Sequence, residues 1–464
     1  MSMKRWTTKP WMCLSKADLN TEREQCRDEG KDLAKYEAEF DALLAAGLDE
    51  DLALQPRAGK LLDRTLGLRP KKDFPYREPS ALADIRKARR ARPGLPKLEL
   101  NDAALRDKAY GAWLGRAAGC LLGKPVEGQP RANIEGYLRA HNCWPLSAYF
   151  PKPASEEARA QFKFPKSDNA CYRENITCMV EDDDTNYTAT GLAVVERFGK
   201  NFTPANMAEF WLGNIPLFHV CTAERVAYRN LAMLVAPPDS AGKVDGKFSS
   251  ATFRNPYREW IGAQIRADFF GYVCPGNPER AAELAFHDAA ISHVKNGIYG
   301  EMWVAAMLAA AYLLKDNAEQ VIRAGLGEIP AKSRLHADLE EVFNWRKEGL
   351  AYGAAVDRLH AKWKEANSHH WCHTNSNAQI VALALLYGGL DYEKTVTYAV
   401  MPGFDTDCNG ATAGSVLGLM LGASALPAKW LSPLNDTLLT GVAGYHRVKL
   451  SQMADKTLEL IKKE

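Results

Sequence analysis

The sequence carries almost no net charge and no disulfide or zinc pattern. Its 464 residues include 59 Lys and Arg against 57 Asp and Glu, so no global charge attracts nucleic acid or a membrane surface. The ten cysteines contain no CxxC pair, which favours reduced, buried thiols in a cytoplasmic protein over a disulfide framework. The N-terminal stretch has no apolar run of signal-peptide length, so export is not expected.

Long hydrophobic runs are also missing. A helix needs about 20 apolar residues to span a bilayer, and residues 302–314 (MWVAAMLAAAYLL) are too few, so they predict a buried core helix. With 46% hydrophobic and 25% charged residues the chain can bury at least one large core, and its length alone allows two or three domains.

Two acidic clusters stand out, each directly before a helical segment. They are Asp182-Asp183-Asp184 and Asp405-Thr406-Asp407. Adjacent carboxylates repel one another, and a fold that gathers them usually supplies an oxygen-binding cation such as Mg²⁺ or Mn²⁺. The alternative is that each cluster caps a helix, although one cap needs only one Asp. The pairing of the two clusters favours a site for two divalent ions.

Glycines recur every fourth residue in two segments. They are Gly111, Gly115, Gly119 and Gly123, and then Gly410, Gly414, Gly418 and Gly422. Each glycine inside a helix costs about 1 kcal/mol relative to alanine, so these stripes predict helices whose backbones approach closely. Small-residue stripes also occur in transmembrane dimers, but Arg116 and the short length of the first segment argue against a membrane helix.

The first hundred residues differ from the rest of the chain. The capping-box pattern at Thr21 and Glu24 predicts the start of a polar helix that reaches toward Gly47, and a region rich in proline and charge follows. From Asn101 onward almost every segment has helical periodicity. The expected organisation is an N-terminal helical extension (residues 1–100) and a helical catalytic domain (residues 101–464).

Four motifs in order give the chain a family resemblance. They are DKAYGAWLGRAAGCLLGKPVEG, DDDTNYTATGLAVVE, SHVKNGIYGEMWVAAMLAAA, and PGFDTDCNGATAGSVLGLMLGA followed by LPAKW. In this order they resemble the ADP-ribosylglycohydrolase family, which includes enzymes like the dinitrogenase reductase-activating glycohydrolase. The resemblance covers residues 101–464. It implies an all-α, compact multi-helix fold with two Mg²⁺ or Mn²⁺ ions, and hydrolysis at the anomeric carbon of a ribose.

The resemblance also assigns roles to residues. It implies metal ligation by Asp183 and Asp184 and by Asp405 and Asp407, with Asp182 where the family commonly has Thr or Ser. It implies acid/base or water-positioning chemistry for Glu127, and it counts Asp183 and Asp407 among the catalytic residues. The segment expected to line the ribose side of the cleft contains His293, Asn296, Gly297 and Tyr299.

Three positions depart from the family pattern. Cys408 replaces a hydroxyl that often binds the second metal, and a thiol is a poor ligand for Mg²⁺. Cys120 stands where the family usually has Asp. The GNGAxMR-like segment on the phosphate side is absent, and WLGNIPLFHVCTAERVAYRNL stands in its place. The loss of this segment favours recognition of a ribosyl or related furanosyl group over recognition of ADP-ribose itself.

A group of His and Cys residues in SHHWCHTNSN (residues 368–377) is the remaining candidate. No distant partner with zinc spacing completes it, although a structural metal site stays open as an alternative. The expected role is a loop at the rim of the cleft, with His373 or Asn375 contacting substrate.

The expected function is a metal-dependent glycoside hydrolase acting on an N- or O-linked ribosyl group. ADP-ribosyl conjugates, free or linked to protein, are the first expected substrates. Alternatives are another furanosyl or nucleoside-type substrate, or an inactive binding protein of the same fold. An enzyme of isoprenoid-synthase type is less favoured because its DDxxD spacing is absent. No nucleic-acid or membrane partner is expected, and the oligomeric state stays open.

Overall fold

The computed structural model describes residues 12–90, 94–162, 166–234, 237 and 249–463. In these ranges nearly all regular structure is helical, so the all-α prediction is confirmed. The exception is a short antiparallel pair, β1 (Thr437–Leu439) and β2 (Arg447–Lys449), with Leu438 opposite Val448. None of the helices in the described part of the chain has the length and apolarity that crossing a bilayer requires. All ten cysteines lie in this part and are free.

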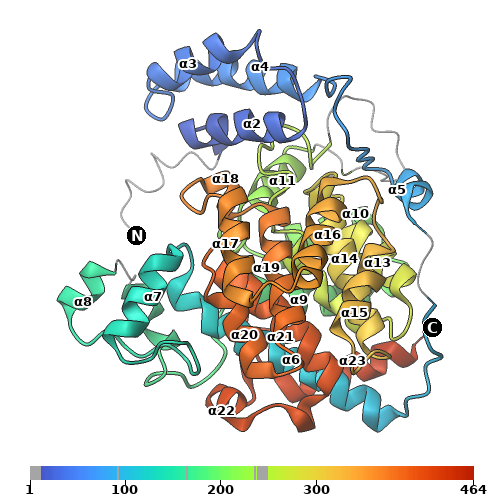
Figure 1. Ribbon diagram of the computed structural model, residues 1–464. Coiled ribbons are helices and arrows are strands. Elements are labelled where there is room, and N and C mark those ends of the chain that lie inside the picture. Colours follow the sequence, from blue (N-terminus) through green and yellow to red (C-terminus); the bar gives the residue numbers. More distant parts are fainter. Residues whose placement is uncertain (1–11, 91–93, 163–165, 235–236, 238–248, 464) are drawn as a thin grey trace.

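The two glycine-striped helices, α6 (Asp102–Gly123) and α21 (Thr406–Leu421), pack side by side at the centre of the molecule (Figure 1). Their glycines face one another in pairs: Gly111 with Gly418, Gly115 with Gly414, and Gly119 with Gly410. A Cβ at any of them would lie under 3.0 Å from the backbone of the other helix, which confirms the predicted close approach. Gly422 is different because it ends α21 with a positive φ of 83°.

The other helices of residues 101–463 surround this pair and share one large apolar core. They are η3 (Lys124–Val126), α7 (Arg131–Ala140), α8 (Glu156–Gln161), η4 (Lys166–Cys171), α9 (Asp183–Phe198), α10 (Pro204–Asn214), η5 (Leu217–His219), α11 (Ala223–Ala232), η6 (Gln264–Arg266), α12 (Asp268–Tyr272), α13 (Pro278–Ala289), α14 (Asn296–Ala311), α15 (Ala318–Leu326), α16 (Arg334–Lys347), α17 (Tyr352–Lys362), α18 (Ser368–Trp371), α19 (Thr374–Tyr387), α20 (Tyr392–Val400), η7 (Ala423–Ala425), α22 (Ala428–Leu431), η8 (Ser432–Leu434) and α23 (Leu450–Lys462). The segment predicted as a buried helix is α14, and all of its residues are buried.

The N-terminal region forms a small helical unit with its own apolar core. It contains α2 (Lys16–Asp28), α3 (Glu37–Ala45), η2 (Leu52–Leu54) and α4 (Gln55–Leu66), drawn in blue at the top of Figure 1. A following helix, α5 (Leu82–Ala88), contributes Ile85 to the large core instead. Residues 1–11 and 91–93 of the predicted extension lie outside the described residues.

Buried ion pairs attach this unit to the rest of the chain. The Arg258 guanidinium lies between Glu22 (Nη1 to Oε2, 2.5 Å) and Glu29 (Nη2 to Oε2, 2.9 Å), and all three side chains are buried. Glu78 of the extension forms a similar ion pair with Arg334 (Oε2 to Nη2, 2.8 Å). A buried charge that loses its partner is strongly destabilising, so the extension and the helical domain depend on one another.

Candidate active site

Helix ends bring the two acidic clusters together where α6 ends and α21 begins. Asp182 caps α9, and its Oδ1 accepts a hydrogen bond from the Asp184 amide at 2.9 Å. Asp405 precedes α21 but makes no side-chain cap bond within the described residues. The capping explanation therefore accounts for Asp182 alone.

Five carboxylates fall into three overlapping groups of possible metal ligands, each with its ligand atoms within 4.8 Å of one another, and Asp183 belongs to none of these groups. The groups are Cys120–Asp182–Asp184, Asp184–Asp407–Cys408 and Glu127–Asp405–Asp407. Because Asp184 and Asp407 each belong to two groups, the three form one continuous acidic site. The carboxylates of Asp182, Asp184, Asp405 and Asp407 are buried, Asp183 is half-buried, and Glu127 is exposed.

Two cations that the sequence analysis did not identify compensate part of this charge. Lys124, in the short η3 turn after α6, forms an ion pair with Asp182. Arg116, buried on α6, pairs with Asp184 (Nη2 to Oδ1, 3.1 Å) and with Asp268 (Nη1 to Oδ2, 2.8 Å). Their partners are distant in sequence, so only the fold could reveal these pairs.

Within the three ligand groups, two buried carboxylate oxygens have no hydrogen-bond partner among the described residues. They are Oδ2 of Asp184 and Oδ1 of Asp407, which belong to the same ligand group. Leaving a buried polar atom unpaired is costly, and buried charges are normally paired or coordinate a metal. The site therefore fits a cation held between these two side chains.

The crowding raises the pKa of most of these carboxyl groups. Burial raises the pKa of Asp183 and Asp184 well above the ordinary value, and it raises the pKa of Asp407 to about 6. The charge of Asp407 is the main reason that the pKa of Glu127, an exposed side chain, is well above its ordinary value. Burial also acts to raise the pKa of Asp182, but Lys124 together with hydrogen bonds from the Asp184 amide and Cys120 lowers it overall. Bound cations would reverse the upward shifts.

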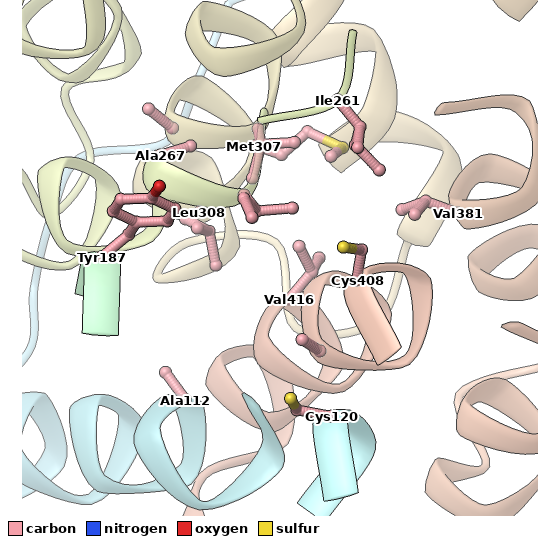
Figure 2. Packing of buried hydrophobic residues seen from close by; sticks show 14 of the residues in the cluster. Ala112, Cys120, Tyr187, Ile261, Ala267, Met307, Leu308, Val381, Cys408 and Val416 are labelled. Carbon is pink, nitrogen blue, oxygen red and sulfur yellow. The ribbon is translucent and has the colours of Figure 1, made fainter. Parts of the chain in front are cut away.

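Three buried thiols line the same region. Cys120 lies on α6 and Cys408 on the first turn of α21 (Figure 2), while Cys372 Sγ lies 3.7 Å from Asp405 Oδ2. Burial raises the pKa of all three thiols well above the ordinary value. They are therefore neutral in the metal-free site, which argues against Cys408 as a nucleophile.

A cluster of buried charged side chains that the sequence analysis did not identify lies near Asp183. The buried guanidinium of Arg266 pairs with Glu224 of α11 and with Asp288 (Nε to Oδ2, 2.5 Å). Burial raises the pKa of Glu224 to about 7, and its charge contributes to the raised pKa of Asp183. Glu224 belongs to the segment that stands in place of the family's phosphate-side motif, which was its only signal in the sequence.

His293, predicted to line the ribose side of the cleft, adjoins these charged side chains. Its Nδ1 lies 2.8 Å from Ser292 Oγ and 3.9 Å from Glu224 Oε1. Its Nε2 is buried and has no partner among the described residues. A buried ring nitrogen of this kind can serve a substrate group or an ordered water.

Of the other three residues of that predicted segment, Asn296 and Tyr299 hold the N-terminal extension, and Gly297 packs against Arg258. The Asn296 amide group donates to Glu78 at 2.8 Å and to Glu259 at 2.7 Å, and its oxygen accepts from the Leu335 amide at 3.0 Å. The Tyr299 hydroxyl donates to the Pro79 carbonyl. A Cβ at Gly297 would lie 2.8 Å from the Arg258 carbonyl oxygen. These contacts are structural and do not support substrate contacts for Asn296, Gly297 or Tyr299.

His373 also contacts the extension. His369 Nε2 lies 3.0 Å and His373 Nε2 3.8 Å from the same Asp28 oxygen. The Trp260 indole N–H donates to Nδ1 of His369, and the Asn375 amide donates to Nδ1 of His373, both at 3.0 Å. With Nδ1 accepting, each neutral ring carries its proton on Nε2, where a metal would need a lone pair.

This group is therefore better described as a clamp on Asp28 than as a metal site. Burial lowers the pKa of His373 to about 3, so its ring is neutral. The Asn375 side-chain amide donates to Asp338 Oδ2 at 2.6 Å. The structure thus gives His373 and Asn375 structural partners and does not place them among the acidic groups.

With this geometry established, comparison with known proteins identifies the family. The sequence profile of the ADP-ribosylglycohydrolase family matches residues 101–464. The chain belongs to this family. No curated protein matches it significantly. A solved structure described as an ADP-ribosylglycohydrolase-related protein complex is 18% identical, covering 78% of this chain and 99% of its own, with a TM-score of 0.46. Family membership supports a glycohydrolase-type activity, and the family typically uses divalent metal ions.

Proposed function

We propose that the protein is a metal-dependent glycoside hydrolase that cleaves an N- or O-linked ribosyl bond, with ADP-ribosyl conjugates as the first candidates. The observation that carries this proposal is the pair of buried, unpartnered oxygens, Asp184 Oδ2 and Asp407 Oδ1, beside the exposed carboxyl group of Glu127. A site for cations and an accessible acid/base group are what metal-assisted glycoside hydrolysis needs.

The charge of the site supports two divalent ions, Mg²⁺ or Mn²⁺. Two cationic side chains, Lys124 and Arg116, face seven carboxylates. The carboxylates are Asp182, Asp183, Asp184, Asp268, Asp405, Asp407 and Glu127. Five negative charges remain, two divalent ions would neutralise four, and a proton on one carboxyl group would neutralise the last. Oxygen ligands of this kind suit Mg²⁺ and Mn²⁺.

Asp184, Asp405 and Asp407, which belong to the ligand groups, would hold the ions together with Asp183, and Asp182 and Cys408 would complete the set of ligands. When bound, divalent ions orient the vicinal hydroxyls of a ribose and lower the pKa of water. Asp407 belongs to two of the ligand groups and so would contribute to both positions.

Among these carboxylates Glu127 is the best placed to exchange a proton with substrate. It is exposed, and the charge of Asp407 raises its pKa, so it retains a proton more readily than an ordinary Glu. A protonated Glu127 can protonate the leaving group, and the resulting carboxylate can then orient the attacking water. The negative charge of half-buried Asp183 would stabilise a developing oxocarbenium ion.

Recognition should centre on the furanose ring and its cis hydroxyls. The family's phosphate-side segment is replaced here by residues that include Glu224, and a carboxylate beside Asp183 disfavours a diphosphate. Of the predicted ribose-side segment, we propose His293 for contact with the sugar, through its buried Nε2. A 2′-deoxy analogue should bind poorly because a buried group would then lose its partner.

A substrate panel tests the proposal. ADP-ribosyl-arginine, ADP-ribosyl-serine, nucleosides and synthetic furanosides would be assayed with Mg²⁺ or Mn²⁺ and after chelation. Asp405→Ala should abolish turnover with the fold intact, whereas Asp455→Ala, an exposed carboxylate on α23, serves as the matched control. Turnover confined to ADP-ribosyl conjugates would show that ADP is required. Activity on none of the substrates would favour a binding protein without catalysis.

The substrate is proposed to be a small molecule or a ribosyl group linked to a protein, with no nucleic-acid or membrane partner. The ten free cysteines favour the cytoplasm as the compartment.

A further inference from the structure

The three ligand groups of the acidic site differ in the type of ligand they offer. The group of Glu127, Asp405 and Asp407 offers only oxygen atoms, whereas the group of Asp184, Asp407 and Cys408 includes a sulfur. Asp407 belongs to both, so a single carboxylate can bridge two neighbouring positions. The two positions would then have unequal ligands.

The third group, which also contains a thiol, is already compensated by protein side chains. Lys124 pairs with Asp182, and Arg116 pairs with Asp184 through Oδ1. The group with Cys408 shares Asp184 with this third group, and the other oxygen of Asp184, Oδ2, is buried and without a partner in the described part of the chain. Oδ1 of Asp407 is likewise buried and has no hydrogen-bond partner among the described residues. Two unpartnered, buried oxygens therefore meet a thiol in this group alone.

The fold fixes Cys408 beside these oxygens. It lies on the first turn of α21, directly after Asp407, and the close contact of Gly119 with Gly410 holds that turn against α6. Figure 2 shows the Cys408 side chain within the apolar core. Its sulfur takes the place of an oxygen ligand, and Mg²⁺ demands near-ideal octahedral oxygen coordination. A thiolate suits borderline ions such as Zn²⁺ and Co²⁺.

We infer that Cys408, Asp184 and Asp407 form a mixed sulfur and oxygen position that takes Zn²⁺ or Co²⁺ in preference to Mg²⁺, beside an all-oxygen position that takes Mg²⁺ or Mn²⁺. This inference rests on the proposed function, since it refines the ligands of the same two-metal site. Binding breaks the S–H bond of Cys408, forms a metal–sulfur bond and releases the thiol proton to the buffer. No oxidant or reductant is involved.

The test is metal binding by the full chain with Zn²⁺ or Co²⁺ alone, read without any activity assay. X-ray absorption at the zinc edge should show one sulfur at about 2.3 Å with oxygens at about 2.0–2.2 Å. Co²⁺ should give a sulfur-to-cobalt charge-transfer band in the near ultraviolet. Both signals should disappear in Cys408→Ser and Cys408→Thr, and Zn²⁺ affinity should fall by roughly tenfold or more. Mg²⁺ binding should persist in both variants.

Control variants separate this thiol from the others. Cys120→Ser and Cys372→Ser test the two neighbouring buried thiols, and Cys178→Ser, a half-buried thiol outside the three groups, tests the substitution itself. All three should keep the sulfur signal. If the signal is lost in Cys120→Ser or Cys372→Ser but kept in Cys408→Thr, the inference is overturned.

The outcomes also separate this inference from the proposed function. Zn²⁺ bound through oxygen alone in the unmodified protein would overturn the mixed position and leave the metal-dependent hydrolase intact. Binding of no divalent ion would overturn both. If Cys408→Ser fails to fold, Cys408→Thr supplies the same comparison with a hydroxyl at the family's usual position.

Discussion

Replacing Gly123 with alanine should weaken metal binding more than it weakens the fold. Gly123 ends α6 against the first turn of α21, and a Cβ there would lie under 3.0 Å from the Thr406 carbonyl and from the Asp407 amide nitrogen. These are backbone atoms, so no side chain can rotate away. Ordinary contact begins at 3.4 Å and the nearest of these atoms would lie at 2.2 Å, so the start of α21 must move by about 1 Å.

That displacement is larger than a metal site tolerates. Ligand distances in metal sites vary by only about 0.2 Å. Gly123 precedes Glu127 by four residues and contacts the backbone of Asp407, and these two carboxylates share one ligand group. We expect a loss of metal affinity of roughly 10–100-fold, the size seen when supporting groups of a metal site are disturbed. Overpacking should lower the free energy of unfolding by about 1–3 kcal/mol. The better helix propensity of alanine offsets up to about 1 kcal/mol of that.

Two matched glycine variants complete the experiment. Gly111→Ala meets the backbone of Gly418 and Ala423 at the far end of the same helix pair, so it should destabilise the protein without reducing metal affinity. At Gly213 of α10 no described atom lies within 4 Å of a Cβ, so alanine there should stabilise by about 0.5–1 kcal/mol. Calorimetric titration with Mn²⁺ and thermal unfolding measure the two effects. Equal losses of metal affinity in Gly111→Ala and Gly123→Ala would refute the reasoning.

Three further predictions concern charge. Lys124→Met removes the ion-pair partner of Asp182, so the metal-free protein should be less stable. Mg²⁺ should then raise its unfolding temperature by more than it does in the unmodified protein, and an equal rise in both would contradict this. Because the pKa of Asp407 is raised to about 6, its stabilising contribution of about 3 kcal/mol is present below pH 4 and lost as pH rises through 6. Thermal unfolding across pH should show that loss only without metal. Removing residues 1–100 leaves the Arg258 guanidinium without Glu22 and Glu29, which should lower the free energy of unfolding by about 3–5 kcal/mol in denaturant titration. The folded fraction should still bind Mn²⁺.

Sequence patterns identified the central helices because the signals are local. Glycines at every fourth residue predict one helix face and require a partner with an equally small surface, and the chain contains two such segments. The acidic clusters were found in the same way. Local pattern was less informative at Thr21, where the predicted helix start is wrong: α2 begins at Lys16 with a capping box between Ser15 and Asp18. Glu22 turns inward to Arg258 instead, a contact that no local rule contains.

By itself, the sequence therefore determined the helical class, the family, the paired helices and the carboxylates that meet where those helices end. Only the tertiary structure decided which charges are already paired. Arg116 and Lys124 compensate two aspartates, Arg266 holds Glu224 beside Asp183, and Asn296 supports the extension. The physical reason is that a periodic pattern fixes the direction of a side chain relative to its own helix. The partner that satisfies a buried charge comes from another element, often hundreds of residues away, and depends on how the whole chain packs.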